Sequence, residues 1–334
     1  MTRPTVLVAR AVFPETVQRL AQHFEVEANP ADRIYARDEL NLRLHGKAGA
    51  FTTASERIDA EVLDANPQLR VVANMAVGYD NIDLAACSAR GVLVTNTPDV
   101  LTETTADFGF ALMLAAARRM SESERFLRSG AWNRWAYDLF SGTDVHHATL
   151  GILGMGRIGQ AIARRGALGF GMKVIYHNRS RLAPALEAPL GACWVDKAAL
   201  LRESDHLVLV LPYSPANHHA IGAAELATMK PTATLTNVAR GGIVDDAALA
   251  AALRERRIAA AALDVFEGEP QVHPALLGLP NVVLTPHIAS SSVATRRAMA
   301  ELAADNLIAA LGGERPPTPL NPEVLARSVR ASRA

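Results

Sequence analysis

The chain has 334 residues, of which 49% are hydrophobic, and its 34 lysines and arginines balance its 34 aspartates and glutamates. This length is sufficient for two domains that each bury a core, and the hydrophobic content excludes a disordered chain. Because the basic residues form no stripe and the formal net charge is zero, neither nucleic acid nor an anionic membrane is an expected partner.

The two cysteines and the first residues bear on the compartment. Cys87 and Cys193 belong to no CxxC or Cys/His spacing, so we expect no structural zinc site and interpret both as buried, small apolar groups. The N-terminus leads directly into a strand-like segment without the apolar stretch of a signal peptide. The longest apolar run, residues 108–117, is too short to span a bilayer. We therefore expect a cytoplasmic protein.

Short apolar runs alternate with amphipathic stretches in the first hundred residues. The pattern predicts strands at 6–9, 24–27, 48–53, 69–73 and 92–95, with helices between them. This alternation is typical of a parallel sheet wound with helices. A long helical pattern then covers residues 102–119, after proline and aspartate at 98–99.

A second alternation begins at residue 149. Strands are predicted at 150–153, 173–176, 206–211, 234–237, 260–265 and 282–284, and a helix at 294–311. The whole pattern predicts an α/β fold with two doubly wound parallel-sheet domains.

A GxGxxG motif lies between the predicted strand at 150–153 and a predicted helix at 160–168. Its members are Gly154, Met155, Gly156, Arg157, Ile158 and Gly159. Gly154 would permit a tight turn, Gly156 a close approach to a pyrophosphate, and Gly159 close packing of helix on strand. In this context the motif predicts dinucleotide binding, and the alternative is a glycine-rich turn without a ligand.

The next predicted strand indicates which dinucleotide is bound. An NAD enzyme needs a carboxylate for the ribose 2′-hydroxyl, but this chain has Asn178 there. Arg179 can pair with a 2′-phosphate and Ser180 can donate to it. We therefore predict NADPH as the cofactor and NADH as a weaker alternative. The open alternative is that Arg179 is only solvated and that other loops decide the cofactor.

Three ionisable residues follow predicted strands: Arg240, Glu269 and His287. Ligands bind at such strand ends in open α/β sheets. Reduction of a 2-keto acid needs a cation for negative charge, a proton donor, and a group that keeps the donor protonated and oriented. Arg240, His287 and Glu269 match these needs in that order. Each residue taken alone has an ordinary structural explanation, and only the combination favours catalysis.

The chain resembles the D-2-hydroxyacid dehydrogenase family along nearly its whole length. The resemblance rests on VGYDNID at 77–83, the glycine motif, ARG at 239–241, LDVFE at 263–267 and PHI at 286–288. Within the family it is most similar to the glyoxylate and hydroxypyruvate reductases, through NMAVG at 74–78, TNTPDVLT at 95–102 and GQAIA at 159–163. It departs from the common pattern at Ala289, where many relatives have glycine, and at 242–243.

The resemblance implies a domain division and a set of contacts. A flavodoxin-like substrate domain would comprise 1–99 and 289–334, a Rossmann NAD(P)-binding domain 100–288, and two chains would form a homodimer. The resemblance implies catalytic roles for Arg240, Glu269 and His287, and it adds Val77, Gly78 and Trp135 as substrate contacts, although either Trp132 or Trp135 could instead pack in the dimer. The implied cofactor contacts beyond the motif and the ribose segment are Thr105, Leu211, Pro212, Val238, Asp264 and Ala289.

We therefore predict an NADPH-preferring reductase of small 2-keto acids, glyoxylate and hydroxypyruvate, with His287 as proton donor. A 2-ketogluconate reductase and an NAD-dependent phosphoglycerate dehydrogenase remain alternatives, and a formate dehydrogenase of this family would have an amide in place of Glu269. A non-enzymatic alternative is a corepressor that senses NAD(H). The pairs His146-His147 and His218-His219 are interpreted as surface residues, because adjacent histidines rarely converge on a metal without further ligands.

Overall fold

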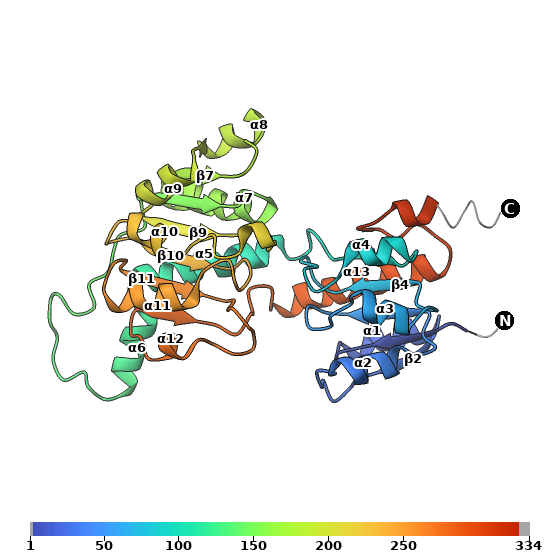
Figure 1. The fold of residues 1–334 in the computed structure, drawn as a ribbon. Helices are drawn as coiled ribbons and strands as arrows, with labels where there is room; N and C mark the ends of the chain where they lie inside the picture. Colours follow the sequence, from blue (N-terminus) through green and yellow to red (C-terminus); the bar gives the residue numbers. More distant parts are fainter. Residues whose placement is uncertain (1–2, 327–334) are drawn as a thin grey trace. The chain divides into compact units, whose positions relative to one another are not determined.

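The computed structural model describes residues 3–326, and the chain forms two compact α/β units (Figure 1). Unit 1 comprises residues up to Leu101 and from Ser292 onward, and unit 2 comprises Thr102–Ser291. Residues 1–2 and 327–334, which belong to the predicted substrate domain, lie outside the described part. Within that part, no helix combines the length and apolar character needed to cross a membrane.

Unit 1 is built on a five-stranded sheet in the order β2-β1-β3-β4-β5, and every pair of neighbours is parallel. Its strands are β1 Thr5–Val8, β2 Glu25–Ala28, β3 Gly49–Thr52, β4 Val71–Asn74 and β5 Leu93–Thr95. Its helices are α1 Pro14–Ala21, α2 Arg37–Leu44, α3 Ala60–Ala65, α4 Leu84–Ala89 and α13 Val293–Leu311. β3 and β4 are buried along their whole length, as expected for inner strands of a sheet covered on both faces.

Helices cover both faces of the unit 1 sheet. Leu20 of α1 and Leu307 of α13 pack with Phe51 in one core, and Leu44 of α2 and Val62 of α3 pack with Val72 in the other. The chain thus returns from unit 2 to complete unit 1 with α13. That helix begins at Ser292, whose hydroxyl accepts a hydrogen bond from the backbone N–H of Thr295.

Unit 2 contains a seven-stranded parallel sheet in the order β12-β11-β10-β9-β6-β7-β8. Its strands are β6 Thr149–Leu153, β7 Lys173–His177, β8 Cys193–Trp194, β9 His206–Leu209, β10 Thr234–Asn237, β11 Ala260–Leu263 and β12 Val282–Leu284. Its α-helices are α5 Thr102–Ala117, α6 Met120–Arg128, α7 Arg157–Arg164, α8 Pro184–Glu187, α9 Lys197–Glu203, α10 Ala223–Thr228, α11 Asp246–Arg254 and α12 Pro274–Leu277. Shorter turns are the π-helix Arg165–Gly169 and the 3₁₀ helices Ala188–Leu190 and Pro215–Asn217.

The strand order of unit 2 reverses next to β6. From β6 the chain adds β7 and β8 on one side, and it then crosses to add β9, β10, β11 and β12 on the other. Ligands of doubly wound sheets bind at such a switch point, beyond the carboxyl ends of the strands. α5 and α7 cover one face through Met113 and Ile162, and α9 to α12 cover the other through residues such as Leu249.

Two local features of unit 2 differ from the sequence predictions. Cys193 is exposed, not buried as predicted, because it lies in the two-residue edge strand β8, whose residues are both exposed. A strand so short has no detectable alternation, so the sequence did not predict it. Cys87, in contrast, is fully buried, and burial, followed by the nearby charge of Asp83, raises the pKa of its thiol to about 12.

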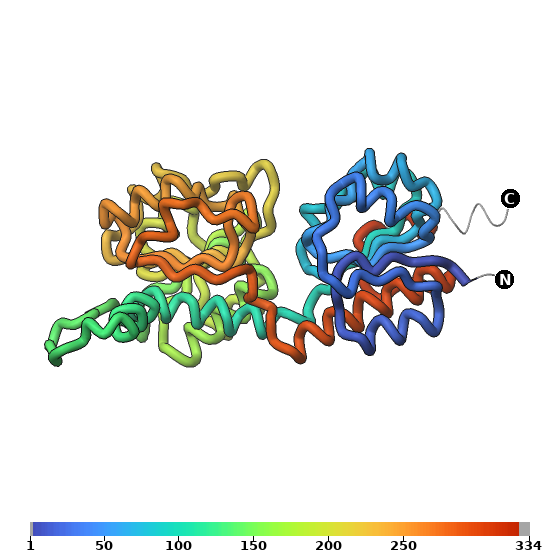
Figure 2. The backbone as a smooth tube through the Cα atoms, turned by 90° about the horizontal axis from the view of Figure 1, so that it is seen from below, coloured from blue at the N-terminus to red at the C-terminus, as the bar shows by residue number. Residues whose placement is uncertain are grey.

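An arm formed by α6 and the irregular residues after it projects from the rest of unit 2, and Figure 2 shows it as the green segment. The side chains of this arm leave much apolar area exposed: Trp132 is 54% exposed, Trp135 78% and Tyr137 86%. Large aromatic groups in this state are unusual on a monomer surface.

Candidate active site

The glycine motif forms the loop between β6 and α7. A Cβ on Gly154, whose φ is +105°, would lie 2.7 Å from the backbone nitrogen of Leu211, and a Cβ on Gly159 would lie 2.4 Å from the carbonyl oxygen of Gly154. A side chain at either position would therefore clash with backbone. A Cβ on Gly156, the residue that precedes α7, would meet no atom within 4 Å. Gly154 and Gly159 thus lie where the loop packs tightly against backbone. Gly156 leaves free space at the N-terminus of α7, where a pyrophosphate would approach.

The segment after β7 contains Asn178 and two arginines with different surroundings. The Asn178 side-chain oxygen accepts a hydrogen bond of 2.7 Å from the backbone N–H of Met155, so it holds the glycine loop. Arg181 donates to the buried Glu187 carboxylate at 2.7 Å. Arg179 and Ser180 are exposed, and neither has an ion pair or hydrogen bond among the described residues. Arg179 is thus available for an anionic ligand.

His287 and Glu269 form a pair beyond the carboxyl ends of β11 and β12. The His287 Nδ1 donates to Glu269 Oε2 at 2.7 Å, and the other carboxylate oxygen accepts from the backbone N–H of Phe266 at 2.9 Å. With Nδ1 engaged, Nε2 is the ring nitrogen left for a ligand. The two side chains are 40% and 31% exposed, so the pair is accessible.

The ionisation of Glu269 reflects its partners. Burial alone would raise the pKa of this carboxyl group. The hydrogen bond and charge of His287, the Phe266 amide and the positive charge of Arg240 outweigh burial and hold the pKa of Glu269 below its ordinary value. The Glu269 carboxylate therefore stays ionised at neutral pH opposite the imidazole.

Asp264, at the end of β11, fixes the loop that contains His287. Its fully buried carboxylate accepts hydrogen bonds from the Thr285 hydroxyl at 2.7 Å and from the backbone N–H groups of Ile288 and Ala289 at 2.8 Å each. Its backbone carbonyl accepts from the His287 N–H at 2.9 Å. These bonds support the left-handed backbone of His287, whose φ is +54°, a conformation that costs energy in a residue with a side chain.

Arg240 follows β10 on a loop that packs directly on the Glu269 loop. The side-chain amide of Asn237 donates to the Arg240 carbonyl at 3.2 Å, and the arginine Nη1 donates to the Ala239 carbonyl at 2.8 Å. A Cβ on the next residue, Gly241, would lie only 1.7 Å from the carbonyl oxygen of Phe266. The absence of a side chain at Gly241 thus lets the arginine loop and the glutamate loop touch.

The remaining predicted cofactor residues lie around the same strand ends of unit 2. Leu211 lies against Gly154, and the Pro212 carbonyl accepts from Asn217 at 2.9 Å. Val238 is buried beside Gly109 of α5. Thr105, on the same helix, has a buried hydroxyl that lacks a hydrogen-bond partner among the described residues. Arg157 and Ile158 begin α7, exposed and half-buried respectively.

The predicted carboxylate clamp belongs to unit 1 and follows β4. The Asn96 side-chain amide donates to the Val77 carbonyl at 2.9 Å, and that of Asn74 donates to the Gly78 carbonyl at 3.0 Å. The backbone N–H groups of Val77 and Gly78 have no acceptor within the described part of the chain. Two fixed, unpaired N–H groups are suited to bind an anion.

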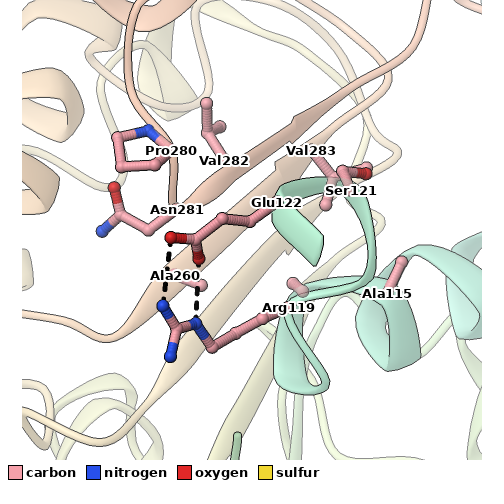
Figure 3. Close-up of a pocket in the computed structure, with 10 residues that line it drawn as sticks. Ala115, Arg119, Ser121, Glu122, Ala260, Pro280, Asn281, Val282 and Val283 are labelled. Atoms are coloured by element: carbon pink, nitrogen blue, oxygen red, sulfur yellow. Dashed lines mark hydrogen bonds and ion pairs between the residues drawn. The ribbon is translucent and has the colours of Figure 1, made fainter. Parts of the chain in front are cut away.

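A small hollow in unit 2 lies away from these groups. It is lined by residues of α5, of the start of α6, of β11 and of β12, including Arg119, Glu122 and Ala260. Figure 3 shows Arg119, which precedes α6, paired with Glu122 of that helix at this hollow. Ala260 and Val282 are the first residues of β11 and β12, whereas Asp264 and His287 follow the last. The hollow therefore lies at the amino ends of these strands, whereas His287 lies beyond their carboxyl ends, so the hollow is not a candidate for the substrate site.

Several residues that position the site were not predicted from the sequence. Asn237 orients Arg240, Gly241 lets two loops meet, and Thr285 completes the hydrogen bonds of Asp264. Their position at the end of a predicted strand or in the loop after it was the available signal.

Comparisons with known proteins identify relatives of the chain. The family model described as D-isomer specific 2-hydroxyacid dehydrogenase, NAD binding domain, matches residues 110–289. A glyoxylate reductase of Thermococcus onnurineus is 50% identical over 327 residues, which cover 97% of each chain. A glyoxylate reductase of Pyrococcus furiosus is 47% identical with the same coverage.

A solved structure extends the likeness to three dimensions. The NADPH-dependent glyoxylate/hydroxypyruvate reductase of Sinorhizobium meliloti, determined with NADP and malonate, has a TM-score of 0.82 and 36% identity, with coverage of 96% of this chain and 97% of that one. The matching family model and the likeness at this identity over nearly the full length lead to one conclusion. The chain belongs to the D-isomer specific 2-hydroxyacid dehydrogenase family and is an NAD(P)-dependent oxidoreductase.

Proposed function

We propose that this enzyme is an NADPH-preferring reductase that converts glyoxylate to glycolate and hydroxypyruvate to D-glycerate. The observation that supports this reaction most strongly is the 2.7 Å hydrogen bond between His287 and Glu269, beyond the carboxyl ends of β11 and β12 in the sheet whose strand β6 leads into the glycine loop. Relatives named glyoxylate reductase, at about half identity over nearly the whole chain, favour the same substrate.

The residues present fit a dinucleotide. Gly156 leaves open space at the N-terminus of α7, and the unpartnered Thr105 hydroxyl is buried nearby on α5, which packs on α7. When bound, the reduced nicotinamide supplies the hydride that adds to the keto carbon. Val238, Asp264 and Ala289 are the proposed contacts of its ring, and Leu211 and Pro212 those of the adenosine.

His287 supplies the proton in this proposal. Its Nε2–H donates to the keto oxygen as negative charge develops there, so the oxygen becomes the hydroxyl of the product. Glu269 stabilises the positive charge of the imidazolium and orients the ring through Nδ1, as an acidic partner does for a catalytic histidine. In the reverse direction the neutral Nε2 accepts the hydroxyl proton.

Arg240 and the unit 1 amides bind the negative charges of the substrate. The guanidinium of Arg240 stabilises the developing alkoxide and the carboxylate, since a fixed cation is most effective where charge appears during the reaction. The N–H groups of Val77 and Gly78 bind the carboxylate, and the bonds from Asn96 and Asn74 to the two carbonyls fix the segment that presents these N–H groups. Both contacts select for acids over simple aldehydes.

The preference for NADPH rests on Arg179 and Ser180. Arg179 is exposed and has no partner among the described residues, whereas Arg181 pairs with Glu187 and is occupied. Asn178 also leaves the ribose side without a carboxylate that would repel a 2′-phosphate. Arginine is well suited to bind such a phosphate through paired hydrogen bonds.

The domain roles and the assembly are part of the same proposal. Residues 1–99 and 289–334 form the substrate domain, and 100–288 form the cofactor domain, which contains the glycine loop and the proton donor. Two chains form a homodimer in which the exposed aromatic arm is covered, and Trp135 limits the size of the substrate. The large exposed area of Trp135 supports the coverage of this arm by a partner chain.

Initial rates test the proposed reaction. Oxidation of NADPH and of NADH is followed at 340 nm with glyoxylate, hydroxypyruvate, pyruvate and 2-ketogluconate. We expect the highest kcat/KM for glyoxylate or hydroxypyruvate with NADPH. A higher value for 2-ketogluconate, or a preference for NADH, would replace this proposal by the corresponding alternative. Cofactor binding without turnover of any acid would instead favour an NAD(H)-sensing regulator.

A further inference from the structure

A second cluster of polar side chains lies beyond the carboxyl ends of β9, β10 and β11. His218 and His219 follow the 3₁₀ helix after β9, and Glu267 follows β11. The donor atoms of these three side chains all lie within 4.8 Å of one another. From the sequence we expected no metal here, because adjacent histidines without further ligands rarely bind one. That premise is wrong for this pair, because the fold brings Glu267 to it from 48 residues away.

The two imidazoles present the same nitrogen to the same carboxylate. His219 Nε2 lies 3.2 and 3.0 Å from the two oxygens of Glu267, and His218 Nε2 lies 3.9 Å from the nearer one. Four ligands around Zn²⁺ at about 2.0–2.1 Å are separated from one another by roughly 3.3 Å. The three donor atoms, all within 4.8 Å of one another, exceed that spacing by no more than about 1.5 Å, so small side-chain rotations suffice to bind one ion.

Each ring also has a polar partner on its other nitrogen. His218 Nδ1 lies 3.3 Å from the Tyr213 hydroxyl, and His219 Nδ1 lies 3.8 Å from Asp245 Oδ2. Histidines that bind a metal through one nitrogen usually donate their second N–H to such a partner, which fixes the tautomer and the ring orientation. The Nε2 atoms of both rings face Glu267.

Packing limits the movement of the cluster. The histidine rings are stacked with centroids 3.9 Å apart, and the His219 backbone N–H donates to the Gly242 carbonyl at 2.7 Å. A Cβ on Gly242 would lie 3.3 Å from His218 Nδ1, so that ring rests on the loop after β10. The backbone N–H of Glu267 donates to the buried Asp246 carboxylate at 3.1 Å.

We propose that His218, His219 and Glu267 form a binding site for one divalent transition-metal ion with the preferences of Zn²⁺. Two imidazoles and a carboxylate are ligands that Zn²⁺ favours, whereas Mg²⁺ requires mostly oxygen ligands. The charges of Glu267 and Asp245 attract a cation. Water fills the remaining position, since both histidines are partly exposed.

A bound ion would tie together loops from three neighbouring strands. The segment with His218 and His219 follows β9 and is bonded to Gly242 after β10, and Glu267 lies two residues before Glu269. A ligand that binds only the folded protein raises its stability in proportion to the logarithm of its concentration. At a hundredfold excess over the dissociation constant, the melting temperature should rise by about 5 °C.

The test is Zn²⁺ binding by the full chain after treatment with EDTA and dialysis, in a Cys193→Ser background that removes the exposed thiol. Calorimetric titration should give one Zn²⁺ per chain with a micromolar dissociation constant, and the melting temperature should rise with Zn²⁺ but not with Mg²⁺. His219→Gln and Glu267→Gln should each weaken binding at least tenfold and abolish the melting shift.

The matched control is the other histidine pair. His146 and His147 are also adjacent, and Asp144 lies 3.7 Å from His146, but their rings are perpendicular and the described residues contain no convergent third ligand. The double variant His146→Gln, His147→Gln should bind Zn²⁺ as the parent does. Absence of Zn²⁺ binding by the parent, or equal binding by the parent and His219→Gln, would overturn the proposal. Neither readout depends on keto-acid turnover.

Discussion

The close approach of Gly241 to Phe266 joins the loop of Arg240 to the loop of Glu269, so a substitution at Gly241 should disturb both loops. A Cβ on residue 241 would lie 1.7 Å from the Phe266 carbonyl oxygen, while real Cβ contacts are essentially never below 3.0 Å. Gly241→Ala therefore forces the two loops at least 1.3 Å further apart. The Phe266 N–H donates to Glu269, so this displacement reaches the His287 pair.

Misplacement of catalytic groups by about 1 Å costs roughly a hundredfold in rate. We therefore expect Gly241→Ala to lower kcat/KM for glyoxylate by about a hundredfold or more while NADPH binding, measured by fluorescence titration, changes little. Gly278→Ala is the control, because a Cβ there meets nothing within 4 Å. Circular dichroism establishes that both variants are folded. Activity of folded Gly241→Ala within threefold of the parent would refute the proposed coupling of the two loops.

Three further changes test other parts of the structure. Arg179→Ala should raise the KM for NADPH at least tenfold and change the KM for NADH little. Substitution of another exposed arginine, Arg202→Ala, is the control, and equal effects of Arg179→Ala on both cofactors contradict the 2′-phosphate contact. Asp264→Asn should lower the free energy of unfolding by about 2 kcal/mol in urea titration, since an amide cannot accept all three bonds; unchanged stability would contradict this role. The hydrogen bond from Arg37 is the main cause that lowers the pKa of Asp59 to about 2, against the opposing effect of burial. The unfolding free energy of the parent should therefore exceed that of Asp59→Asn by about 1 kcal/mol at neutral pH, and this difference should disappear as the pH falls from about 4 to about 2. A difference that does not depend on pH argues against the ion pair.

The fold was predictable because its signals are local. Buried parallel strands appear as short apolar runs between amphipathic helices, and all strands except β8 were predicted within a few residues. The apolar pattern overestimated the length of two strands. The strand predicted at 206–211 ends at Leu209 in β9, and the strand predicted at 260–265 ends at Leu263 in β11. Asp264 leaves the sheet because its carboxylate binds the backbone of the His287 loop.

The site was predictable in its residue types but not in its contacts. Glycine spacing and strand-end residues indicated a dinucleotide and the trio of Arg240, Glu269 and His287. The sequence could not decide which arginine after β7 pairs internally, since that depends on the buried Glu187. It also gave no sign that Glu267 meets His218 and His219, because residues far apart in the chain converge only through the tertiary fold.

The measurement that tests the proposed chemistry most directly is the steady-state kinetics of His287→Ala with NADPH and glyoxylate, beside the exposed His45→Ala as control. The proposed mechanism predicts that kcat falls by about a hundredfold or more, because the proton donor is removed, while the dissociation constant for NADPH stays within about twofold. A kcat equal to that of the parent would contradict the assignment of His287 as the proton donor.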